Sequence, residues 1–362
     1  MMAYTYRHKL QIYFIAQILC TVWLTATVCG ESDKYSEDEV VNENNVLAWY
    51  ILDVSQILQN SKVNTILSPM NLLKTPAIVD LRFGADNEME GINMILAESR
   101  RSLSRPENVE MFYNTKIQEI SFADTENHIA MINDWGKRVT NEEFPKLIES
   151  NSSLKNLQVL ILNMFHFVET LEINFKYTAN LLFYITPKQR TKVPAVETTE
   201  YLKYLDSQML DAKILQLPYS NGFSMYILLP HTKAGLNELL SILGFEQLKR
   251  LQWMMEVRRA NVLMPTFKYS FITNLKEDIL DKSDHRFDSD FENSFSKEKD
   301  FLNIFKVAAI SFNGTGKPRV EDYQNIRSAK YEKFHVDRPF VYYIENKYGE
   351  IVCIGKVENP EQ

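Results

Sequence analysis

Histidine and serine are the residues through which this chain could do catalytic or metal chemistry, and their spacing favours neither. The six histidines are scattered, with no His-x-x-x-His spacing that would place two of them on one helix face for a metal. The sequence has no Gly-x-Ser-x-Gly turn for a serine nucleophile and no Gly-x-x-x-x-Gly-Lys loop for a phosphate. A Ser/His/Asp triad assembled only by the fold stays compatible with the sequence, but nothing points to one. We therefore expect no enzyme, no cofactor and no metal site.

The most unusual segment is a polar stretch, Asn313–Lys333, near the C-terminus. Glycine, proline and charged residues dominate it, and no apolar period is sustained, which predicts an exposed loop. Two strand-like segments must hold its ends, the apolar run Phe305–Phe312 before it and Phe334–Phe340 after it. A loop of this length inside a compact domain is usually functional or disordered.

The N-terminus predicts a secretory signal peptide over residues 1–30. A basic start, Arg7 to Lys9, precedes an apolar run, Leu10–Val28, and an acidic stretch begins at Glu31. Small or apolar residues at positions 28–30 suit cleavage after Gly30. A single membrane anchor is the alternative, because the run is near the lower limit for spanning a bilayer. The small residues and the sharp polar switch favour a cleaved signal, hence a secreted, extracellular protein with no membrane partner.

Other features of the mature chain fit this compartment. Asn151 and Asn313 head the two Asn-x-Ser/Thr glycosylation sequences, and the second lies at the entrance of the loop. Cys353 is the only cysteine after residue 30, and its apolar neighbours predict a buried packing residue rather than a reactive thiol. A net charge of −7 without a basic cluster argues against nucleic acid as a partner. We expect a monomer.

The order of elements predicts an α+β fold in one domain over residues 31–362. Helical periodicity prevails in the first half and strands in the second, with large antiparallel sheets and no linker. The main expected helices are 42–59, 128–139, 236–243 and 245–251, and the main expected strands are 158–167, 213–217, 223–229, 261–265, 342–344 and 351–357.

Several segments, in order, resemble the signatures of the serpin family. They are Asn64-Thr65-Ile66-Leu67-Ser68-Pro69, Ile132-Asn133-Asp134-Trp135, Phe183 to Pro194, Leu215-Gln216-Leu217-Pro218-Tyr219, Met225-Tyr226-Ile227-Leu228-Leu229-Pro230, Pro265-Thr266-Phe267-Lys268, Phe334–Phe340 and Gly355–Pro360. The general likeness is to divergent insect members. The resemblance implies the serpin fold: three β-sheets with a helical cap and an exposed reactive-centre loop, here Asn313–Lys333. In that family a serine protease cleaves the loop, which then inserts as an extra strand into the central sheet and traps the protease.

The hinge of the loop departs from the family pattern. The family has Gly-Thr followed by small residues, whereas this chain has Gly314, Thr315 and Gly316 followed by Lys317-Pro318-Arg319. Whether Gly314 or Gly316 is taken as the hinge glycine, a lysine and a proline fall where alanine is wanted. Proline cannot donate to a sheet ladder, and a buried unpaired charge costs several kcal/mol. A glycan on Asn313 would add bulk at the same place.

Two more departures concern the central sheet. Leu171 stands where the family has a tryptophan, eight residues after Asn163. The stretch between Glu90 and Ile120 is short, so the helix and edge strand of that region are expected to be largely missing.

The expected bait within the loop is Arg327-Ser328, which suits a trypsin-like serine protease, with Ser328 or Lys330 as alternatives. Arg327 could equally be a solvated loop residue. The sequence therefore predicts a secreted serpin-like protein with impaired or no inhibition. A working or substrate-like inhibitor of a trypsin-like protease through Arg327, and a non-inhibitory carrier, are the alternatives.

Overall fold

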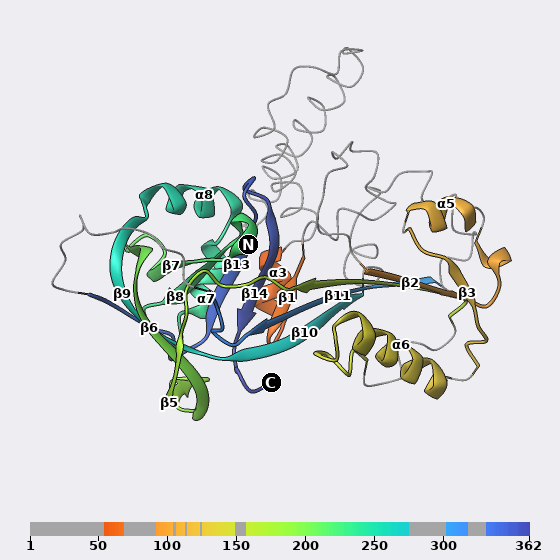
Figure 1. Cartoon of the computed structure of the whole chain (residues 1–362), viewed down its shortest axis with the longest axis horizontal. Helices are drawn as coiled ribbons and strands as arrows, with labels where there is room; N and C mark the ends of the chain where they lie inside the picture. The colour runs from red at the N-terminus through yellow and green to blue at the C-terminus, as the bar shows by residue number, and fades with distance from the viewer. Residues whose placement is uncertain are drawn as a thin grey trace, which may run out of the picture. The chain divides into compact units, whose positions relative to one another are not determined.

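The computed structural model describes eight stretches of the chain, all within one compact unit that spans Val41–Gln362 (Figure 1). These are residues 54–68, 92–103, 106–112, 114–123, 125–148, 157–274, 302–317 and 331–362. The predicted signal peptide and the acceptor Asn151 lie outside the described residues, as does the middle of the loop, residues 318–330.

One sheet of the described chain has five strands, in the order β10-β11-β4-β2-β3. Its inner strands β4 and β11 run parallel and pair over nine positions, from Leu302 opposite Val159 to Ile310 opposite Phe167. Both faces of these strands are covered, which explains why their sequences are apolar runs rather than alternating ones. The bounds are β2 Ile92–Ala97, β3 Ile117–Glu119, β4 Val159–Phe167, β10 Phe267–Asn274 and β11 Leu302–Phe312.

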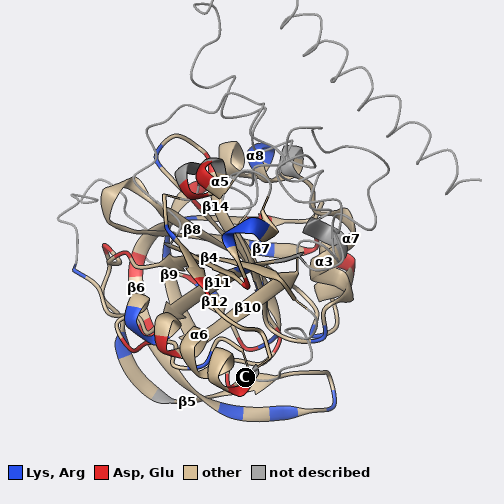
Figure 2. Cartoon of the chain, turned by 90° about the vertical axis from the view of Figure 1, so that its right-hand side faces the viewer, with Lys and Arg blue, Asp and Glu red and all other residues tan. Residues whose placement is uncertain are grey.

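One face of this sheet packs against helix α6, Thr125–Val139 (Figure 1 and Figure 2). Ile132 and Trp135 project from α6 into a cluster with alternate residues of β4 and β11, among them Leu162 and Val307. The helix predicted from the Ile-Asn-x-Trp segment is therefore confirmed.

The remaining strands form a nine-stranded sheet, in the order β1-β14-β13-β8-β7-β6-β9-β12, with β5 paired to β6. Strand β6, Arg190–Ser207, is 18 residues long and pairs in turn with β5, β9 and β7. Where the resemblance implies three sheets, the described strands form two by hydrogen bonding, because the long strand β6 joins β5 and β9 to β7 in one sheet. The other bounds are β1 Thr65–Leu67, β5 Lys176–Tyr184, β7 Ala212–Pro218, β8 Ser224–Pro230, β9 Glu256–Pro265, β12 Glu332–His335, β13 Phe340–Glu345 and β14 Ile351–Val357.

The helices and hairpins of the second half follow the sequence patterns. Helices α7, Leu236–Ile242, and α8, Phe245–Met254, lie where helical periodicity predicts them. Strands β7 and β8 form the predicted hairpin, whose turn is a short helix η3, Ser220–Gly222. Of the helix expected over 42–59, the described part is α3, Val54–Asn60. These elements confirm the α+β class.

The prediction that the edge strand of the five-stranded sheet is missing was wrong. The region between Glu90 and Ile120 contains β2, a short helix η1 (Arg100–Ser102), helix α5 (Pro106–Phe112) and β3, so the edge strand is present. The prediction was wrong because it rested on the length of this region alone. Two three-residue elements, η1 and β3, and the seven-residue helix α5 are enough to complete the sheet.

Glu110 on α5 holds this compact edge together. Its carboxylate accepts two hydrogen bonds from the Arg100 guanidinium, at 2.6 and 3.3 Å, and one from the backbone N–H of Ile117 at the start of β3, at 3.0 Å. Lys116 Nζ lies 3.1 Å from the same carboxylate. These partners, the Arg100 hydrogen bond first, lower the pKa of Glu110 to about 2.

We expect the Glu110→Gln variant to loosen β3 and to change the acid stability of the protein. Because the folded pKa of Glu110 lies below its ordinary value, the stability that it contributes is present above pH 4.5 and is lost as the pH falls toward about 2. The variant should therefore show a weaker loss of stability in that window and faster amide exchange at Ile117–Glu119, measured by hydrogen exchange. Glu107→Gln, at an exposed position 3.6 Å from Arg100, is the matched control and should behave as wild type. Equal exchange in both variants would contradict this role.

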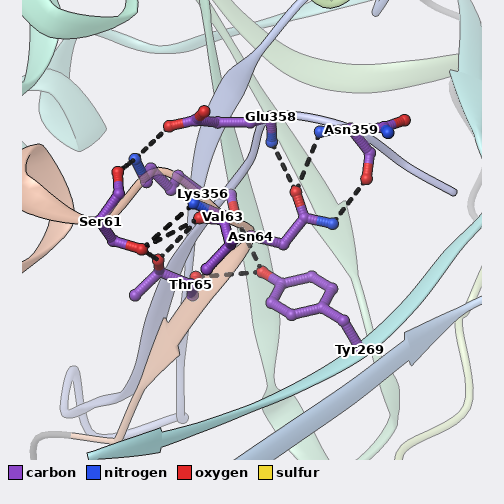
Figure 3. A network of polar contacts seen from close by, with 8 residues as sticks. All are labelled: Ser61, Val63, Asn64, Thr65, Tyr269, Lys356, Glu358 and Asn359. Carbon is purple, nitrogen blue, oxygen red and sulfur yellow. Dashed lines mark hydrogen bonds and ion pairs between the residues drawn. The ribbon is translucent and has the colours of Figure 1, made fainter. Parts of the chain in front are cut away.

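A buried polar junction joins the two ends of the described chain (Figure 3). Asn64 Oδ1 accepts from the backbone N–H groups of Glu358 and Asn359, at 2.8 and 3.0 Å, and its Nδ2 donates to the Asn359 carbonyl at 2.6 Å. Lys356 is fully buried beside it, where Nζ donates to the Ser61 carbonyl at 2.6 Å and pairs with Glu358. The first and last signature segments of the sequence therefore contact each other directly, with β1 paired to β14.

Candidate functional site: the hinge of the loop

The loop is described at both of its ends, residues 313–317 and from Tyr331 onward. Pro318 and the predicted bait residues Arg327, Ser328 and Lys330 lie outside the described residues, so their placement stays a prediction. The hinge residues Gly314, Thr315, Gly316 and Lys317 are described and follow β11 directly.

The hinge leaves β11 and docks onto the segment that connects β4 to β5. The Gly314 carbonyl accepts from the Phe175 N–H at 3.2 Å, and the Lys317 N–H donates to the Leu171 carbonyl at 2.8 Å. Gly316 forms a parallel bridge with Leu171. Because β4 and β11 pair directly up to Ile310 and Phe167, the hinge lies beyond the end of their pairing and not between them.

Both hinge glycines are required by this docking. A Cβ on Gly316 would lie 2.0 Å from the Ile173 carbonyl oxygen and 2.5 Å from that of Leu171, closer than any side chain can approach. Gly314 has φ +73°, in the left-handed region, and a Cβ there would lie 2.9 Å from Phe175 Cβ and Val196 Cγ2. The Gly-Thr-Gly sequence is therefore explained by close backbone approach.

The β4–β5 connection that the hinge contacts is also bound by the β7–β8 turn. Leu171 is buried and also forms an antiparallel bridge with Tyr219 in the β7–β8 turn. The Ser220 N–H donates to the Thr170 carbonyl at 2.8 Å, and Ser220 Oγ donates to the Glu169 carboxylate at 2.6 Å. At the position where the family has a tryptophan, this chain thus uses the backbone of Leu171 to join the hinge to the β7–β8 turn.

The polar side chains of the hinge face solvent. Asn313, Thr315 and Lys317 are exposed, and Asn313 Oδ1 accepts from the Thr315 N–H at 2.9 Å. The predicted acceptor Asn313 is therefore accessible, while the charge of Lys317 stays in water.

The far end of the loop is anchored by β12, which pairs in parallel with β9. Phe334 is fully buried against Tyr204, with ring centroids 6.4 Å apart. His335 Nε2 lies 2.9 Å from Asn261 Oδ1, and Asn261 Nδ2 donates to Glu197 at 2.8 Å. Burial, with Lys333 nearby, lowers the pKa of His335.

A row of polar side chains crosses the five-stranded sheet, and sequence reasoning missed it. In register, Thr273 lies opposite Lys306, Lys306 opposite Asn163, and Asn163 opposite Asn93. Lys306 and Asn163 are each 4% exposed and occupy the seam at which β11 and β4 would have to separate for a strand to enter. Asn163 Nδ2 donates to Asn93, and a small cavity lined by Ser68, Thr273 and Lys306 lies beside the row. A lysine inside the apolar run 305–312 is the signal that could have revealed it.

The opposite face of the seam is covered by the segment that follows α6. His166 on β4, opposite Ala309 of β11, lies with Nε2 3.1 Å from the Glu143 carboxylate and edge-on to Phe144. Burial lowers the pKa of His166 despite Glu143.

The other residues that could carry metal or catalytic chemistry have structural roles. In the part of the chain that the structure describes, no group of three His, Cys, Asp or Glu side chains could hold a metal ion. Cys353 is fully buried in β14, which confirms the predicted packing role, and burial raises the pKa of its thiol. His231 lies 2.7 Å from both Asp206 and Asp211, where it ties the end of β8 to the β6–β7 turn.

Comparisons with known sequences agree with this geometry. A family model described as "Serpin (serine protease inhibitor)" matches residues 103–360. Serine protease inhibitor 2 of Anopheles gambiae is 26% identical over 265 residues, which cover 68% of this chain and 64% of that protein. Human heparin cofactor 2 is 28% identical over 274 residues, which cover 69% and 53%. The chain thus spans between half and two thirds of the length of these curated relatives.

Solved structures show the same fold at low sequence identity. Serpin48 of the insect Tenebrio molitor has a TM-score of 0.67 at 20% identity, covering 91% of this chain and 100% of that one. Human thyroxine-binding globulin, solved with its hormone, has a TM-score of 0.71 at 15% identity and covers 90% and 99%. Across the described ranges, no helix is long and apolar enough to cross a membrane.

Proposed function

The chain belongs to the serpin family, and from that premise we propose that it is a secreted member whose loop is cut by trypsin-like serine proteases without efficient inhibition. Inhibition in this family depends on insertion of the cleaved loop between β4 and β11. The relatives named above include a protease inhibitor and a hormone-binding globulin, so membership alone leaves the activity open.

The observation that carries the proposal is the chemistry of the hinge at the place where it docks. To insert, the chain from Gly316 onward must leave Leu171 and enter the seam, which breaks the Lys317–Leu171 hydrogen bond. The charged Lys317 side chain would move from water into the sheet. This costs several kcal/mol unless a partner pairs with the charge. Pro318 then offers no N–H to the neighbouring strand, so one ladder hydrogen bond cannot form.

Secretion follows from the predicted signal peptide 1–30, and glycans on Asn151 and Asn313 fit that route. The exposed Asn313 side chain supports this part of the proposal. The mature chain 31–362 would then act as a single-domain monomer with no cofactor.

Trypsin tests the proposed function. We expect incubation with trypsin to cut the mature protein after Arg327, to leave no band at the combined mass on a denaturing gel, and to change the melting temperature by no more than about 3 °C, since without insertion no new contacts form. Arg327→Ala should abolish the cut, whereas Lys330→Ala, which alters the alternative bait, should not. A protease-linked band that survives denaturation would instead establish the working inhibitor.

A further inference from the structure

The β5–β6 hairpin concentrates positive charge in a chain whose net charge is −7. Residues 176–196 contain four cations, Lys176, Lys188, Arg190 and Lys192, and no carboxylate. All four are exposed, and Figure 2 shows Lys and Arg segments along the ribbon of this hairpin. Three of the four, Lys188, Arg190 and Lys192, alternate within five residues around the start of β6, and pairing with β5 brings Lys176 into the same hairpin.

Register places the charge around an aromatic side chain on one face. Arg190 lies opposite Tyr184 and Lys192 opposite Leu182 in the antiparallel pair, so these four side chains share a face. Lys233, from the loop after β8, lies with Nζ 3.1 Å from the centre of the Tyr184 ring. The neighbouring cations Lys233 and Arg190 lower the pKa of Tyr184. We call this set, Leu182, Tyr184, Arg190, Lys192 and Lys233, the basic face.

The basic face adjoins both described ends of the loop. Val196, on the same face of β6, packs against Gly314 of the hinge, and Lys192 and Arg190 follow it at about 13 and 20 Å along the strand, at about 3.3 Å per residue. The Tyr184 N–H donates to the Asp337 carbonyl at 2.8 Å, just past β12. The strands run in the order β5-β6-β9-β12, so the loop begins beside β5 and ends at β12. The basic face therefore lies beside the described residues at both ends of the loop.

We propose that the basic face is a docking surface for an acidic patch on the protease that cleaves the loop, an inference that rests on the function proposed above. Exposed apolar area favours a protein over a linear polyanion as the occupant. Tyr177 is 73% and Leu182 36% exposed, and aromatic residues with arginine dominate protein interfaces. The outer edge of β5 pairs with no other described strand, so it can also donate backbone hydrogen bonds to a partner. Charge complementarity of this kind acts mainly on the association rate.

Two trypsin isoforms, one anionic and one cationic, share the specificity for Arg and Lys and differ in charge, so they test the inference directly. At low ionic strength, we expect the anionic isoform to cleave the loop at least about tenfold faster than the cationic one, with the difference lost at high salt. R190E/K192E should reduce the anionic rate about tenfold, while R138E/K146E, an equal charge change at exposed positions near α6, should leave it unchanged. Equal rates for the two isoforms, or equal effects of the two variants, would overturn the docking surface.

Binding of catalytically inactive isoforms, with the nucleophilic serine replaced by alanine, separates the two proposals. If neither active isoform cuts the loop but the inactive anionic isoform still binds wild type in a salt-dependent way and R190E/K192E weakly, the docking surface stands and the bait function fails. If the loop is cut but binding ignores both charge and variant, the docking surface fails alone. Retention on heparin at physiological salt that R190E/K192E removes, with protease rates unaffected, would assign the face to a polyanion and also overturn the proposal.

Discussion

Replacing Lys317, Pro318 and Arg319 together with alanine is expected to restore insertion of the cleaved loop. The change removes two charges that would have to enter the sheet and returns the N–H that proline lacks. About ten new backbone hydrogen bonds to β4 and β11, at about 1 kcal/mol each, should then raise the melting temperature of the trypsin-cut triple variant by at least about 10 °C over its uncut form. Wild type should show no such rise. Differential scanning calorimetry before and after cleavage measures both.

The control is the single variant K317A, which keeps Pro318 and should give a smaller rise than the triple variant. A complex with trypsin that survives denaturation should accompany the rise, because fast insertion is what traps the protease in this family. If the cut triple variant melts at the temperature of cut wild type, then the obstacle lies elsewhere, and the Leu171 docking or the Lys306 row becomes the next candidate.

Asn64→Ala is expected to produce a large loss of stability from a single polar change. The side chain satisfies three backbone groups of Glu358 and Asn359 and is 4% exposed. A buried donor or acceptor left without a partner costs about 1–3 kcal/mol. Since the three bonds are coupled through one amide, we expect the free energy of unfolding to fall by about 2–4 kcal/mol in a urea titration.

Asn180→Ala provides the matched control, because Asn180 lies exposed on β5 and its loss should change the stability by no more than about 0.5 kcal/mol. Amide exchange should speed up in Asn64→Ala first at β1 and β14, the strands that the junction joins. If amide exchange speeds up evenly over the protein, with β1 and β14 no faster than the rest, then Asn64 does not act as the local tie described here.

The order of elements and most long strands follow from apolar periodicity, because strands buried on both faces, such as β4 and β11, leave long apolar runs in the sequence. The compact edge around Glu110 does not follow from apolar periodicity. Its strands are only three and six residues long, and ion pairs rather than a repeated apolar pattern hold them in place. The hinge glycines were expected, but their reason was not: Gly316 is constrained by Leu171 and Ile173, some 145 residues earlier in the chain. The basic face likewise could not be predicted in full from the sequence, because Lys233 contacts Tyr184 only once the chain has folded.

The parallel pair β4–β11 has a consequence for how the protein folds. Its partners lie 143 residues apart, as in Ile310 opposite Phe167, so the pairing forms only after most of the chain has been synthesised. Contacts of such high sequence separation slow folding, and until they form the edge of β4 stays open to other strands. Synthesis of residues 302–357, which supply β11 to β14, therefore decides when the five-stranded sheet closes.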